Sequence, residues 1–374
     1  MERSGSGRMC GAWGQLPCLW SVGAKARTGA SGVGWLLQAM VPGVAAQGRG
    51  DRMIPDSPDH PSRGARAAAA SVAGVVAGVF VVLLYSRQAA GVVSDWDATW
   101  TGARALLEGK SPYAAVQMPP WPWRINYPIP ALLLSTPFAL LPLWLARGVF
   151  VGVGTAVFTF VVTRRAWWPL YFVLSPAMLW SWIAVKWEPL MVAATLTPAL
   201  GWILSVKPTQ GFALWSAYPR REAVIGGVIL LALGFAVYPP WVQEWIGSLA
   251  GTPHRPHLIR PLGFLLLLGL LRWRRPEGRM LAVLCVIPQT TAIYEVLPLT
   301  LLVRTRMEAA TYAALTLLAH LVYLLGPQGP WPVGAEYQWW VMLALFYAPA
   351  LALVLRRPNV GPIVPEKPPD FGAE

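Results

Sequence analysis

The stretch Ala67–Tyr85 reads AAAASVAGVVAGVFVVLLY and contains no charged residue. At about 1.5 Å of rise per helical residue, it is long enough to cross a hydrocarbon core of roughly 30 Å. Arg63 and Arg66 come just before it, and the acidic run Ser94-Asp95-Trp96-Asp97 comes shortly after it. This stretch therefore predicts a membrane-spanning helix with a basic side and an acidic side.

The composition of the whole chain indicates the same class of protein. The 374 residues are 55% hydrophobic and only 13% charged, which is too apolar for an ordinary soluble domain. We expect an all-α polytopic membrane protein, because helices satisfy their own backbone hydrogen bonds in lipid. The net charge of +13 comes from short basic clusters between apolar runs, so nucleic acid is not an expected partner.

Apolar segments continue along the chain and predict about ten membrane crossings. Two of them are too short to cross alone, so we expect half-helices that meet at the outer face near Glu295. The segment 129–142, broken by Pro130 and Pro137, predicts a short or re-entrant element. The crossings after the first are expected near 144–163, 167–185, 188–204, 222–238, 258–271, 280–290, 293–303, 308–325 and 339–355.

The basic residues give this arrangement an orientation under the positive-inside rule. We expect a plasma-membrane protein with both termini in the cytoplasm. The outer side would receive Arg87, Arg104, Lys110, Arg124, Lys186, Arg255 and Arg260. The inner side would receive Arg49, Arg52, Arg63, Arg66, Arg164, Arg165, Lys207, Arg220, Arg221, Arg272, Arg274, Arg275, Arg279, Arg304, Arg306, Arg356, Arg357 and Lys367.

Two terminal tails flank the apolar region 67–357. Residues 1–66 are rich in Gly, Ala, Arg and Ser, and they predict a disordered tail that could not build a core. Met53 is a plausible true start, while a cleavable signal peptide in the first part of the tail is the alternative. The Pro-rich residues 358–374 predict a second disordered tail.

Several kinds of site are not indicated. The sequence has no Gly-rich phosphate loop, so a nucleotide-sugar donor is unsupported. Cys285 lies in an apolar run and supports neither a disulfide nor a metal cluster. His254 and His257 indicate a solvated outer loop more than a metal site.

Charged residues next to apolar segments are the candidates for chemistry, because ionisable groups are costly there. Asp95 and Asp97 are the candidate catalytic acids, and Lys186, Glu188 and Glu295 lie at predicted outer turns. A solvated turn is the alternative for each of them.

The outer loop itself has further structure. The segment 100–109 predicts an amphipathic helix lying flat on the membrane, with Trp100 and Leu106 toward lipid. Arg124 is a candidate phosphate ligand, or it only extends toward the membrane surface. Trp121 and Trp123 anchor the loop at the interface or stack on a sugar.

These loop residues resemble one family. The pattern is an acid after the first span, then Gly102-Ala103-Arg104-Ala105-Leu106-Leu107 with Pro112-Tyr113, then Tyr127-Pro128-Ile129-Pro130 and a run ending in Pro142. It is similar to bacterial polytopic mannosyltransferases of the GT-C fold class that use polyprenyl-phosphate mannose. Lys207-Pro208 resembles a Lys-Pro element that follows a mid-chain span in that family.

The resemblance implies a transfer of a hexose or pentose from a polyprenyl-phosphate donor to a lipid or polysaccharide acceptor at the outer face. It implies Asp95 as general base, although Asp97 could be the aligned acid instead. With Asp95 as base, Asp97 is its partner through hydrogen bonding or a divalent metal, and Arg124 or Lys186 binds the phosphate. Further substrate-binding candidates are Glu188, Glu295, Tyr127 and Trp100. No cofactor is implied with certainty, and dependence on a divalent metal stays open.

Two alternatives belong to other classes. A transporter or flippase of lipid-linked sugars would also be polytopic and could use Glu188 and Glu295 within a pathway. A membrane assembly protein without catalysis is the third possibility.

Overall fold

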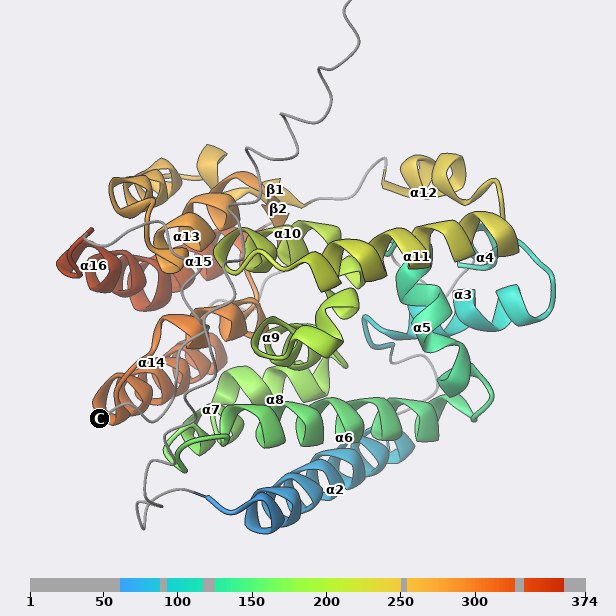
Figure 1. Cartoon of the computed structure of the whole chain (residues 1–374), viewed down its shortest axis with the longest axis horizontal. Coiled ribbons are helices and arrows are strands. Elements are labelled where there is room, and N and C mark those ends of the chain that lie inside the picture. The colour runs from blue at the N-terminus through green and yellow to red at the C-terminus, as the bar shows by residue number, and fades with distance from the viewer. Residues whose placement is uncertain (1–60, 88–92, 117–124, 250–253, 327–332, 360–374) are drawn as a thin grey trace, which may run out of the picture. The chain divides into compact units, whose positions relative to one another are not determined.

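The computed structural model describes residues 61–87, 93–116, 125–249, 254–326 and 333–359, and these residues are nearly all helical (Figure 1). The predicted tails lie almost entirely outside this part of the chain. The one described sheet pairs two short antiparallel strands, β1 (Arg255–Pro256) and β2 (Pro288–Gln289).

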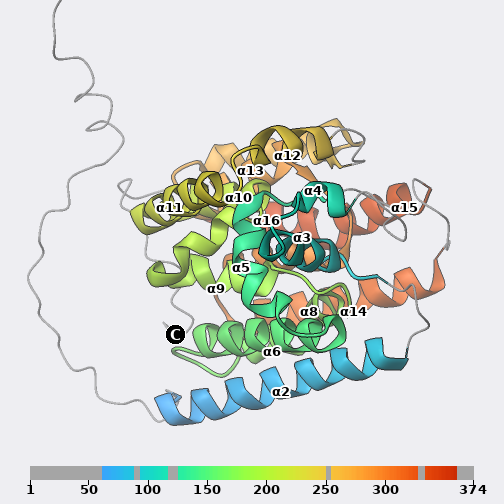
Figure 2. The same cartoon turned by 90° about the vertical axis from the view of Figure 1, so that its right-hand side faces the viewer.

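The first predicted span is helix α2 (Arg63–Arg87), which packs along α6 (Leu143–Val162), as both views show (Figures 1 and 2). Glycines spaced by four residues on each helix face one another. A Cβ on Gly74 would lie 2.7 Å from the carbonyl oxygen of Gly152, and one on Gly148 would lie 2.8 Å from that of Gly78. Small residues at this spacing let two helix backbones approach closely, as in membrane helix pairs.

The loop after α2 folds into three helices: α3 (Asp97–Leu107), α4 (Pro112–Ala115) and α5 (Ile129–Ala139). The helix predicted at 100–109 is α3, and the chain turns at Gly109 with φ +68°. The expected lipid-facing side is not lipid-facing. Trp100 and Leu106 are half-buried against the core, and Trp100 Nε1 donates to the Phe138 carbonyl oxygen over 3.2 Å.

Prolines divide the middle of the chain into short pieces. Because proline fits the first turn of a helix but not its interior, each of four successive elements begins at or next to one. They are α8 (Pro176–Ile183), α9 (Glu188–Leu196), the 3₁₀ helix η1 (Pro198–Val206) and α10 (Pro208–Ala217), preceded by the single turn α7 (Leu170–Val173). The predicted spans 167–185 and 188–204 are therefore both interrupted.

The second half alternates long helices with short ones. Helix α11 (Arg221–Val237) bends by 105° into α12 (Trp241–Leu249). The short elements are η2 (His257–Ile259), η3 (Gly263–Arg272), α13 (Pro276–Val286) and η4 (Ile293–Leu302). The chain ends with α14 (Arg306–Leu325), α15 (Val333–Met342), the π-helical turn η5 (Leu343–Tyr347) and α16 (Ala348–Arg356).

Fewer helices are suited to crossing a membrane than the sequence predicts. Within the described residues, four helices are long and apolar enough, and a fifth counts if the bent α11–α12 pair is one span. The four are α2, α6, α14 and the continuous segment Tyr337–Arg356. These apolar helices are those of a membrane protein, and the other predicted crossings are short or broken helices.

Helix α9 and η1 form a hairpin and not a crossing, which corrects the predicted side of Lys207. The segment 188–204 was expected to cross the membrane, with Glu188 at its start and Lys207 beyond its end. The Lys207 ammonium nevertheless lies only 2.7 Å from Glu188 Oε1. The chain reverses at Thr197-Pro198, between α9 and η1, which pack against each other. Lys207 therefore lies on the Glu188 side and not on the opposite, inner side.

Candidate functional site

A cavity of about 340 Å³ is lined by polar residues from six separate parts of the chain. Four residues singled out in the sequence line it: Asp95, Tyr127, Lys186 and Glu295. They come from the segment before α3, the segment before α5, the turn before α9, and η4. The other polar side chains of its wall are those of Asn126, Lys207, Thr209, His254, Gln289 and Thr290.

The Asp95 carboxylate lines this cavity and forms an ion pair with a buried lysine. Its Oδ2 forms an ion pair with Lys186 Nζ and accepts a hydrogen bond from the Tyr127 hydroxyl over 3.1 Å. The Asp95 side chain is 36% exposed, whereas that of Lys186 is 4% exposed. The carboxylate is thus the accessible member of the pair.

The pair fixes the charge state of both groups. Loss of solvent alone would raise the pKa of the Asp95 carboxyl, but the Lys186 ammonium outweighs this effect and holds that pKa below its usual value. Conversely, desolvation would lower the pKa of Lys186, but Asp95 raises it well above the usual value. Asp95 is therefore ionised and Lys186 is protonated at neutral pH.

Strained backbone places Lys186. Val185 has φ +53°, in the left-handed region that β-branched residues rarely adopt. This turn lets the Lys186 amide donate to the Ser181 carbonyl oxygen over 3.0 Å, and the ammonium lies 4.1 Å from the centre of the Tyr294 ring. Such strain persists only where the surroundings enforce it, and it is frequent at functional sites.

A second lysine bridges two buried carboxylates at the cavity wall. Lys207 Nζ lies 2.7 Å from Glu188 Oε1 and 2.9 Å from Glu295 Oε1, and both glutamates are 1% exposed. Gln210 and Thr290 also donate to Glu295, over 3.0 and 2.8 Å. Glu188 does not line the cavity itself, but it forms an ion pair with Lys207, which does.

Asp97 has a different environment from Asp95. Its side chain is fully buried, and both of its oxygens accept hydrogen bonds from Arg147 of α6, with Nε at 2.7 Å. The Ser94 amide donates to it as well, over 2.7 Å. Asp97 does not line the cavity, and both of its oxygens bond to Arg147, so the expected hydrogen bond between the two acids is not formed. Asp97 instead ties the start of α3 to α6.

The remaining predicted residues fall elsewhere. Trp100 lies against α5, as described above, and does not line the cavity. Arg124 lies outside the described residues. His257 is fully buried, with Nε2 2.9 Å from the Tyr347 hydroxyl, so the solvated loop expected there is wrong for this residue. Across the described ranges, no three His, Cys, Asp or Glu residues gather as a metal site.

Four residues of this site were not predicted from the sequence: Lys207, Gln210, Thr290 and His254. Lys207 carried the one available signal, the resemblance of Lys207-Pro208 to a family element, but the predicted topology assigned it to the opposite side. His254 lines the cavity, where desolvation lowers the pKa of its ring.

The described cavity can bind an anion through its lysines and accept a proton on Asp95. No protein-family model, curated protein or solved structure matches this chain.

Proposed function

We propose that this chain is a membrane glycosyltransferase of the GT-C type. It would move a hexose such as mannose, or a pentose, from a polyprenyl-phosphate donor to a lipid or glycan acceptor at the outer face of the plasma membrane, with both termini in the cytoplasm. The observation that carries the proposal is the accessible Asp95 carboxylate beside two lysines in one cavity.

The proposed reaction needs one base and one anion site. Asp95 takes the proton of the acceptor hydroxyl as that oxygen forms the new bond to the sugar C1. The C1–O bond to the phosphate breaks with its electron pair, and the polyprenyl phosphate leaves as an anion. Lys186 and Lys207 stabilise that phosphate as point charges.

The Asp95–Lys186 pair also allows donor binding to increase the basicity of Asp95. While Lys186 holds Asp95, the pKa of the carboxyl is low and the carboxylate is a weak base. A donor phosphate that draws Lys186 toward itself removes this stabilisation, so the pKa of Asp95 rises. The base would then be strongest when the donor is in place.

The test is incorporation of labelled sugar from a polyprenyl-phosphate donor into membrane product. Asp95→Asn keeps the volume and removes the basicity, so transfer should fall roughly 10²–10⁴-fold with membrane abundance unchanged. Glu108→Gln is the matched control, because Glu108 is an exposed acid at the end of α3 that pairs only with Arg104 and Lys110. Full transfer by Asp95→Asn would refute the mechanism, and donor translocation without product would favour the flippase alternative.

A further inference from the structure

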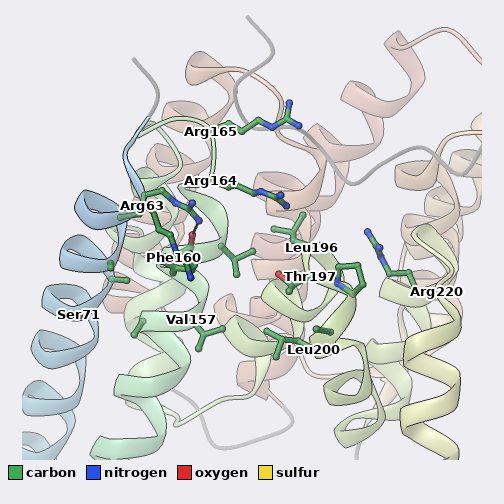
Figure 3. Close-up of a pocket in the computed structure, with 17 residues that line it drawn as sticks. Arg63, Ser71, Val157, Phe160, Arg164, Arg165, Leu196, Thr197, Leu200 and Arg220 are labelled. Carbon is green, nitrogen blue, oxygen red and sulfur yellow. Dashed lines mark hydrogen bonds between the residues drawn. The ribbon is translucent and has the colours of Figure 1, made fainter. Parts of the chain in front are cut away.

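A second and larger cavity lies at the opposite end of the α2–α6 pair and is distinct from the Asp95 cavity. It has a volume of about 960 Å³, at the upper end of ordinary ligand sites, and lies between α2, α6, η1 and the start of α11 (Figure 3). We call it the arginine groove. Five arginines line it: Arg63, Arg66, Arg164, Arg165 and Arg220.

The arginine groove has a strongly basic lining. None of its lining residues, all within the described part of the chain, is an Asp or a Glu. Glu222 pairs with Arg221 and also acts on the charge of Arg220, but it does not line the groove. Clustered like charges repel one another, so this arrangement favours an anion in the groove.

Two arginines also have buried nitrogen atoms without acceptors. The Nε atoms of Arg66 and Arg220 are buried and have no hydrogen-bond partner. Arg66 is held in place by its Nη2, which donates to the Phe160 carbonyl oxygen, and by stacking 4.3 Å from the Phe160 ring centre. Buried donors are nearly always satisfied in proteins, so each of these two needs an acceptor, which a bound anion or a water can supply.

The rest of the arginine groove is apolar. Figure 3 shows Arg164 and Arg165 above and Arg220 on the right-hand wall, with Val157 and Leu200 farther down the groove. Beside it, α2 exposes Val72 and Val75 at 63% and 64%, as a lipid-facing helix does. A ligand that fits this division has an anionic head and a hydrocarbon chain.

We propose that the arginine groove binds the phosphate headgroup of an anionic membrane phospholipid, with an acyl chain along Val157 and Leu200. Under the predicted orientation this face is cytoplasmic, where anionic lipids attract basic residues. The proposal does not depend on the proposed transfer reaction.

The test uses the full-length protein in phosphatidylcholine nanodiscs that contain a photoactivatable phosphatidylglycerol. Crosslinks should form with peptides of α2, α6 or η1, and a photoactivatable phosphatidylcholine should not label them. Arg164→Gln with Arg220→Gln should weaken phosphatidylglycerol binding ~30-fold, at roughly fivefold for each charge. Neither side chain makes a hydrogen bond or ion pair in the described structure, so folding should be retained.

Two further variants make the result specific. Arg164→Lys with Arg220→Lys keeps the charge and should keep most of the binding. Arg306→Gln removes an exposed arginine that has no side-chain partner among the described residues and does not line the groove, so this variant should bind the lipid as the unmodified protein does. Equal labelling by both lipids, or unchanged binding in the double Gln variant, would overturn the proposal. Displacement of the lipid by millimolar inorganic phosphate would overturn it too, because the groove would then be a site for free anions.

Discussion

Replacing Asp97 by Asn tests whether this acid is structural, as its contacts indicate. The substitution leaves one acceptor oxygen and turns an amide N–H₂ toward the guanidinium of Arg147, which already donates there. Arg147 is 6% exposed, so its buried charge would lose the Asp97 carboxylate that pairs with it. Breaking a buried pair from one side costs about 3–5 kcal/mol, so we expect a much lower melting temperature and lower membrane abundance.

The double variant Asp97→Asn with Arg147→Met distinguishes this explanation from others. Because it removes the uncompensated charge, it should regain part of the lost stability, and the cycle should show a coupling of more than about 1 kcal/mol. The assay is thermal unfolding of the purified full-length protein in detergent. If Asp97→Asn melts as the unmodified protein does but loses transfer activity, Asp97 takes part in the chemistry and the structural assignment fails.

Gly148→Ala places a Cβ 2.8 Å from the Gly78 carbonyl oxygen and 2.4 Å from Val82 Cγ2. It should therefore destabilise the protein by about 1–3 kcal/mol in the same unfolding assay. Gly64→Ala is the control and should not destabilise it, because nothing lies within 4 Å of the added Cβ. A cysteine replacing Thr209 in the cavity wall should react with a membrane-impermeant thiol reagent added on the side that labels Gly109→Cys. It should not react from the side that labels Arg306→Cys. Reaction from the Arg306 side would mean that Lys207 lies at the inner face after all. Burial lowers the pKa of His257 to about 3 from its ordinary 6.5, so between these values the unfolded state binds more protons than the folded state. The free energy of unfolding should therefore fall as the pH falls, by up to about 1.4 kcal/mol for each pH unit. His257→Gln should reduce this slope, and an unchanged slope would contradict the burial of a neutral ring.

The sequence predicts best what is encoded locally. Continuous apolar runs give α2, α6 and α14 with ends within a few residues of the expected ones. Asp95 and Glu295 were singled out because charges are rare in so apolar a chain, and the structure places both at one cavity.

What the sequence could not predict depends on contacts between distant segments. Asp95 and Asp97 lie two residues apart in one short run, so local sequence does not tell them apart. The packing of α3 against α6 pairs Asp97 with Arg147 and leaves Asp95 at the cavity. Hydropathy cannot distinguish a crossing from a hairpin, because both are apolar, and this is why the side of Lys207 was assigned wrongly. Pro198 was visible in the sequence, but the direction of the chain after it was not.

The two cavities differ in how their cations are neutralised, and this difference sets what each can recognise. In the Asp95 cavity, Lys186 and Lys207 already have carboxylate partners, so an entering phosphate must exchange one anionic partner for another. Such an exchange adds little net attraction and depends on geometry, which favours discrimination between ligands. In the arginine groove none of the described lining residues is a carboxylate, so binding there should follow charge and weaken as salt rises. The two cavities, at the two ends of α2 and α6, therefore differ in their electrostatics as expected if one selects a substrate and the other holds an abundant lipid, as we propose.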